Sequence, residues 1–140
     1  MTLPTPVSQL VAAGRLERVP ADAASARARL TRAEEKLAAA VKIAAIDVEI
    51  AYVTAYDATR IAVTAHMLSF GFRVRGIAGA HEAVGSYATA MIASPSAHEF
   101  QRMRRRRNKS EYDDVIIGRA DLAADLQHAQ AIIAAVRAAI

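Results

Sequence analysis

Several residue types that are absent from the sequence, or scarce in it, limit what the protein can be. It contains no cysteine, which excludes disulfides and thiolate metal sites. Its four histidines (His66, His81, His98 and His128) show no HExxH or paired spacing, so no metal site and no cofactor is expected. A reducing, cytoplasmic setting is the simplest interpretation.

Long hydrophobic runs are also missing. The most apolar stretch, 37–46, is short and is interrupted by Lys42, so no membrane association is expected. The N-terminus lacks a basic segment followed by a long apolar stretch, and Pro4 and Pro6 interrupt it early. This pattern does not match a secretory signal.

Helix breakers and aromatic residues are scarce, whereas alanine is abundant. The 140 residues include six glycines, four prolines and no tryptophan, and roughly a quarter of them are alanine. Alanine is the best helix former, and its small side chain lets helices approach closely. The composition therefore predicts an all-α fold, an antiparallel bundle of about five helices.

Periodicity and capping signals place these helices. Residues 1–20 form an arm or a short helix over 7–17, and 21–140 form the helical domain, whose first helix starts near Asp22 and runs to about 45. A second long helix covers 47–70 and ends at Gly71, with or without a break at Asp47. We expect its buried face to carry Ile46, Ile50, Val53, Asp57, Ile61, Thr64 and Leu68.

The second half of the chain predicts three more helices. After a loop over 71–79, a short helix covers 81–92. A capping box of Ser96 and Glu99 is expected to open the next helix, which carries Met103 and a run of arginines. The last helix spans about 119–140.

The basic charge is concentrated in one place. Six of the eighteen basic residues fall within 102–109, which contains no acid, so the rest of the chain holds twelve basic and fourteen acidic residues. This run is either a solvated basic face or a patch that binds phosphates. The candidate phosphate-binding residues are Arg102, Arg104, Arg105, Arg106 and Lys109.

Arg107 differs from its neighbours in this run. On a helix it lies beside the apolar stripe of Phe100 and Met103, whereas Arg102, Arg105, Arg106 and Lys109 point more toward solvent. An arginine beside a buried stripe needs a carboxylate or phosphate partner. Asp57 is the candidate partner, although an intrahelical contact between Asp57 and Arg60 would explain this acid equally well.

Four short segments, in this order, resemble the HEPN superfamily. They are Tyr56-Asp57-Ala58-Thr59-Arg60, Leu68-Ser69-Phe70-Gly71, Gly79-Ala80-His81 and Arg107-Asn108-Lys109-Ser110-Glu111-Tyr112. The resemblance implies a helical bundle that pairs as a homodimer. It also implies a toxin–antitoxin, defence or RNA-processing role, with RNA or a nucleotide as ligand and a cognate antitoxin or a nucleotidyltransferase-fold protein as partner.

Many members of that family are metal-independent endoribonucleases with an Arg-x4–6-His motif. Arg107 and Asn108 match the start of the motif, but Tyr112 stands five residues after Arg107, where a histidine would be expected. A tyrosine ordinarily titrates near pH 10, so it is a poor default base for a ribose 2′-hydroxyl. The resemblance implies Arg107, Asn108, Tyr112 and Asp57 as catalytic candidates. His81, just after Gly79, is expected to be a helix-start or packing residue.

Three functions stay open at this stage. The chain is a HEPN-like ribonuclease with a degenerate Arg-x4-Tyr motif, a non-catalytic HEPN module that binds RNA, a nucleotide or a partner protein, or a plain structural bundle.

Overall fold

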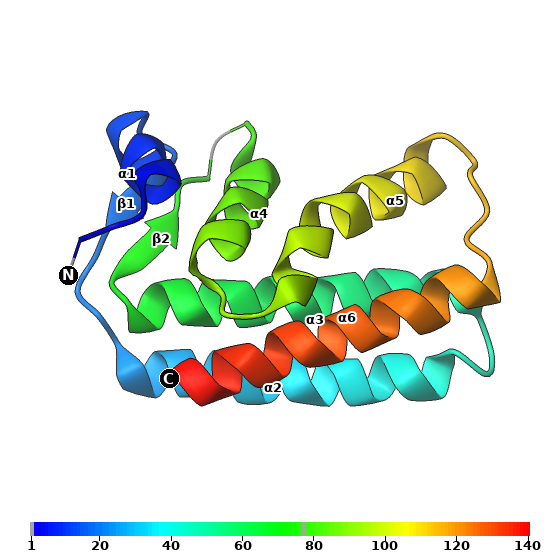
Figure 1. Cartoon of the computed structure of the whole chain (residues 1–140). Coiled ribbons are helices and arrows are strands. Elements are labelled where there is room, and N and C mark those ends of the chain that lie inside the picture. Colours follow the sequence, from blue (N-terminus) through cyan, green and yellow to red (C-terminus); the bar gives the residue numbers. More distant parts are fainter. Residues whose placement is uncertain (1, 77) are drawn as a thin grey trace.

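Two layers of helices make up the molecule (Figure 1). The computed structural model describes residues 2–76 and 78–140. Three long helices, α2 (Ala23–Ile43), α3 (Val48–Ser69) and α6 (Arg119–Ala139), pack together in the first layer, with α2 on the side of α3 away from the shorter elements. The second layer holds the shorter elements: α1 (Thr5–Ala12), β1 (Leu16–Arg18), β2 (Phe72–Val74), α4 (Ala80–Met91), the 3₁₀ helix η1 (Pro95–Glu99) and α5 (Phe100–Tyr112). The predicted helical fold is confirmed, with six α-helices in the described residues.

The starts of α2 and α3 follow from two aspartates. Asp22 accepts a hydrogen bond from the Ser25 N–H at 3.0 Å, and Asp47 accepts one from the Ile50 N–H at 2.9 Å. Each carboxylate caps an N–H group that a helix start leaves without a partner. Asp47 therefore marks the break that the sequence left undecided, and α2 and α3 form a helical hairpin.

Gly71 ends this hairpin. Its φ of 84° lies in the left-handed region, and a Cβ added there would lie 2.9 Å from the Val19 carbonyl oxygen. Glycine is required for both reasons, as the expected cap at this position implies.

The long helices are not all antiparallel. The α2 and α3 helices run in opposite directions, but α6 runs in the same direction as α3 (Figure 1). Tyr52 near the start of α3 donates a hydrogen bond of 2.6 Å to Asp125 near the start of α6. The expectation of a wholly antiparallel bundle is wrong for this pair, because α4, η1 and α5 stand between α3 and α6 in the sequence and return the chain to the starting end.

The buried face of α3 is not the one that its isoleucines suggested. Ile46 is 84% exposed and Ile50 is 56% exposed, whereas Tyr52 and Tyr56 are each about 1% exposed. The buried face also contains five alanines of this helix: Ala51, Ala55, Ala58, Ala62 and Ala65. Small side chains allow α2 and α6 to approach α3 closely, so alanine takes the core and isoleucine is left outside.

The N-terminal segment differs in detail from the expected helix over 7–17. The helix α1 ends at Ala12, and Leu16–Arg18 forms a strand that pairs antiparallel with Phe72–Val74. Val7 is fully buried and Leu10 is 8% exposed, and both belong to the main core. The N-terminal segment is therefore part of the main hydrophobic core of the helical domain.

The expected capping box at Ser96 is wrong. The Ser94 hydroxyl, not that of Ser96, accepts from a backbone N–H, and it opens a 3₁₀ turn before α5. Ser96 instead contacts His128 of α6, with 2.9 Å between the hydroxyl oxygen and Nδ1. Within the described residues, no helix has the length and apolar character needed to cross a membrane.

Candidate functional site

The charges of α5 divide between opposite sides of the helix. Arg102 and Arg106, four residues apart, face α6, while Arg104, Arg107 and Asn108 face α4. Arg105 and Lys109 are exposed. This division follows from the helical repeat, because residues three or four apart share one side.

Arg102 and Arg106 do not point freely into solvent as expected. Both donate to Asp125, which is 1% exposed, with distances of 2.6 Å and 2.8 Å. Burial alone would raise the pKa of Asp125, but hydrogen bonds from Arg102 and Tyr52 hold it below its usual range. A buried carboxylate needs such partners, so these two arginines attach α5 to α6.

The other side of α5 forms a cavity with the start of α4. The cavity has a volume of about 450 Å³ and is lined by Ala78, Gly79, Ala80, His81, Glu82, Arg104, Arg107, Asn108 and Tyr112. Gln101 links the two helices, because its amide donates to the Glu82 carbonyl at 3.0 Å and accepts from Arg104 Nε at 3.0 Å. Three of the four proposed catalytic residues (Arg107, Asn108 and Tyr112) therefore share one cavity.

Three neighbours hold the Arg107 side chain in place. Its side chain is 23% exposed, and its Nη1 lies 3.3 Å from Glu111 and 3.3 Å from the Asn108 side-chain oxygen. Its guanidinium carbon lies 5.8 Å from the centre of the Tyr56 ring, a cation–π contact. The expected Asp57–Arg107 ion pair is wrong, since Glu111, one turn along α5, takes that place. Asp57 forms no ion pair with Arg60 either, within the residues described.

Asp57 nevertheless acts on this site through its charge. It raises the pKa of the neighbouring Tyr56 and opposes the lowering of the His81 pKa. The charge of Asp57 on α3 thus affects the pKa of groups at the cavity, although Asp57 forms no direct bond with Arg107.

His81, expected to be a helix-start or packing residue, does lie at the start of α4. It occupies the second position of α4, after the left-handed Gly79, and lines the same cavity as Arg107. Partial burial and the charges of Arg60, Arg107 and Arg104 lower its pKa below the ordinary value of 6.5. Although His81 is an exposed residue, this lowering of its pKa favours the neutral imidazole, the form that can accept a proton.

Three buried polar atoms near the cavity lack a hydrogen-bond partner among the described residues. They are the Tyr56 hydroxyl, Arg60 Nε and Arg107 Nε. Burial raises the pKa of Tyr56 to about 12, although the charges of Arg60, Arg104 and Arg107 oppose that rise. Of these three residues only Arg107 lines the cavity, so its guanidinium keeps an unused donor next to it.

The start of α4 adds to the positive character of the cavity. Gly79 has no side chain to cap the first-turn N–H groups of α4, and those residues line the cavity. A helix start carries partial positive charge. Together with Arg104 and Arg107, it favours a phosphate at this position.

Tyr112 lies at the rim of the cavity, with 77% of its surface exposed. In the described part of the chain, no group of three or more histidine, cysteine, aspartate or glutamate side chains is arranged to hold a metal ion.

No protein-family model matches the chain, and comparisons with curated proteins and with solved structures give no match either.

Proposed function

We propose that this chain is a HEPN-like RNA-binding protein of a toxin–antitoxin or defence type that cleaves RNA by metal-independent transesterification. The observation that carries the proposal is the shared cavity of His81, Arg104, Arg107, Asn108 and Tyr112. His81 supplies, from another helix, the histidine that the Arg-x4-Tyr segment lacks.

The chemistry follows from the positions of these groups. Neutral His81 takes the proton of a ribose 2′-hydroxyl, and the 2′-oxygen attacks the adjacent phosphorus. The bond to the 5′-oxygen breaks, and that oxygen takes a proton from water, which leaves a 2′,3′-cyclic phosphate. Arg107 and Arg104 stabilise the charge that develops on the phosphate. Asn108 and Tyr112 position the ribose.

The test is RNA cleavage in EDTA by the purified protein and by two variants, Arg107→Ala and His81→Ala. We expect each substitution to lower the cleavage rate by about two orders of magnitude or more, since each removes a group that acts in the transition state. The products should end in 2′,3′-cyclic phosphates.

His98→Ala is the matched control, because His98 is an exposed histidine outside the cavity. Its rate should equal that of the unaltered protein. Equal loss in the His98 and His81 variants would overturn the role of His81. RNA binding without cleavage by any of these proteins would favour the non-catalytic module.

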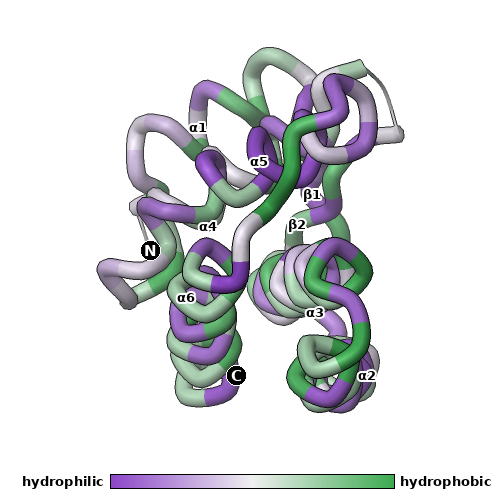
Figure 2. Tube along the Cα trace, turned by 90° about the vertical axis from the view of Figure 1, so that its right-hand side faces the viewer, coloured by the Kyte–Doolittle hydropathy of each residue, from purple (hydrophilic) through white to green (hydrophobic). Residues whose placement is uncertain are grey.

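We also propose a homodimer, formed through an apolar end of the molecule that consists of Ile46, Ile50, Tyr112, Val115 and Ile116. These five side chains are between 44% and 91% exposed. Figure 2 shows the hydrophobic linker from α5 to α6 crossing this end. An exposed apolar group of this size suits a protein interface, either with a second copy or with a cognate antitoxin or nucleotidyltransferase-fold partner.

A further inference from the structure

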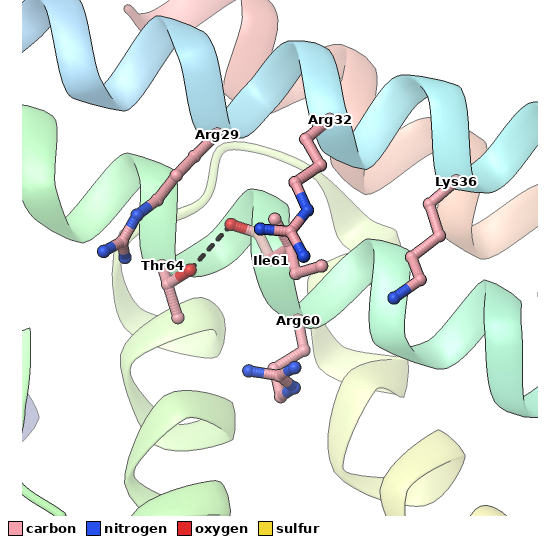
Figure 3. A pocket seen from close by; sticks show the side chains of 6 residues that line it. All are labelled: Arg29, Arg32, Lys36, Arg60, Ile61 and Thr64. Carbon is pink, nitrogen blue, oxygen red and sulfur yellow. Dashed lines mark hydrogen bonds between the residues drawn. The ribbon is translucent and has the colours of Figure 1, made fainter.

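A second basic cleft lies between α2 and α3, apart from the cavity at α4 and α5. It has a volume of about 280 Å³ and is lined by Arg29, Arg32, Lys36, Arg60, Ile61 and Thr64. Figure 3 shows Arg29, Arg32 and Lys36 reaching from α2 toward α3. We call it the α2–α3 cleft.

Its three α2 residues share one side of that helix, at spacings of three and four. From Arg29 to Lys36 the helix rises by about 10 Å, which exceeds the size of a single phosphate group. The row therefore suits several phosphates in sequence.

The charges of the cleft are not neutralised within the protein. Among the described residues, no carboxylate lies within 4.0 Å of the charged nitrogens of Arg29, Arg32, Lys36 or Arg60. On α5, by contrast, Arg102 and Arg106 each have two such partners and Arg107 has one. Thr64 donates its hydroxyl hydrogen to the Ile61 carbonyl at 2.8 Å, the bond drawn in Figure 3. Four cations that are close together and lack acidic partners repel one another unless an anion joins them.

Arg60 connects the cleft to the candidate site. It lines the α2–α3 cleft. Its charge, like those of Arg104 and Arg107, also acts to lower the pKa of His81 and opposes the rise in the pKa of Tyr56. Its buried Nε has no hydrogen-bond partner among the described residues. Arg60 thus places positive charge between the two hollows, so that basic side chains continue from α2 across α3 to α5.

We infer that the α2–α3 cleft is a backbone subsite that holds the phosphates of a single nucleic-acid strand whose cleavage site occupies the α4–α5 cavity. The position of the cleavage site in this inference rests on the proposed function, whereas the binding of the strand in the cleft does not. Contacts with phosphates do not read the bases, and RNA and DNA carry the same phosphate groups. The cleft therefore binds strands of either kind.

A strand that cannot be cleaved tests the subsite separately from the chemistry. The probe is a fluorescein-labelled 12-nucleotide oligodeoxyuridine, which lacks 2′-hydroxyls, and the readout is fluorescence anisotropy across a series of salt concentrations. The variant is Arg29→Gln/Arg32→Gln. Its matched control is Arg27→Gln/Lys42→Gln, which removes two exposed charges of α2 outside the cleft.

We expect the cleft variant to bind the strand about tenfold more weakly at 50 mM salt. The slope of log affinity against log salt should fall by about 1.4, since each lost contact with a single strand contributes about 0.7. The control variant should keep the slope of the unaltered protein. Thermal unfolding of both variants establishes that they are folded.

Three results would overturn the subsite. One is an equal loss of affinity in the cleft and control variants, which would indicate a general effect of charge. Another is a failure of the unaltered protein to bind the strand at 50 mM salt, which would leave an acidic protein segment as the occupant. The third is competition by inorganic phosphate alone with no gain from a longer strand. Absence of RNA cleavage by the unaltered protein, with strand binding retained, would overturn the proposed cleavage but leave the subsite intact.

Discussion

At the residue scale, the pH dependence of cleavage depends on His81. The rate should be low where the imidazole is protonated, rise about tenfold per pH unit, and level off above its pKa, which lies below 6.5. Measurement of kcat/KM from pH 4.5 to pH 9 tests this. A rate that keeps rising toward pH 10 would point to Tyr112 as the base instead.

Asp57→Asn provides the control for this profile. The Asp57 carboxylate raises the pKa of His81, so its neutralisation should move the rising limb of the profile to lower pH. An unchanged limb would show that Asp57 does not act on the base.

His81 also shows which properties of a single residue cannot be predicted from the sequence. The sequence placed Arg107 and Asn108 beside the apolar stripe of one helix, because a helix fixes which residues share a side, and in the structure both line the cavity. The partner of Arg107 and the place of His81 depend on how α4 packs on α5, and no local pattern encodes that packing. The sequence signal for the place of His81 was Gly79, whose left-handed conformation sets the direction in which α4 starts.

At the element scale, Asp125 fixes α5 and its cavity to the long-helix layer. Asp125→Ala should lower the free energy of unfolding by about 3 kcal/mol, since it leaves the Tyr52 hydroxyl and two arginines without their shared partner. Urea unfolding at pH 7 measures the loss. Asp121→Asn, which alters a half-exposed acid on the same helix, should cost less than about 1 kcal/mol.

The sign of the pH dependence gives a second test of Asp125. Its pKa is lower in the folded protein, so its stabilisation is complete above about pH 4 and is lost as the pH falls through the folded pKa. Asp125→Asn should flatten this acid limb. An equally steep limb in the variant would assign acid unfolding to other groups.

Elements with a repeated pattern or a strong cap were predictable, and elements without one were not. Asp22 marked the start of α2 and Gly71 the end of α3, because their capping chemistry is local, whereas the sequence left the break at Asp47 open. The strands Leu16–Arg18 and Phe72–Val74 are three residues each and pair across more than fifty residues of chain, so no periodicity marks them. The buried face of α3 was misjudged because alanine carries little hydrophobic signal but packs closely.

At the scale of the whole molecule, the exposed isoleucines Ile46, Ile50 and Ile116 are the basis for the dimer. A side chain such as Ile116, which is 91% exposed, gains from burial against a second copy. Light scattering at micromolar concentration should give twice the mass of the chain, and Ile50→Glu/Ile116→Glu should give the monomer, since paired interfaces bring like charges together.

Ala138→Glu is the control for the dimer, because it places an acid on an exposed position near the opposite end of the molecule (Figure 1). It should leave the mass doubled. A monomer in the unaltered protein would remove the homodimer and leave the apolar end to a different partner. Because Tyr112 belongs both to the apolar end and to the rim of the cavity, dimerisation should also alter access to His81 and Arg107. If so, the monomeric variant will differ from the unaltered protein in RNA cleavage as well as in mass, whereas Ala138→Glu will differ in neither.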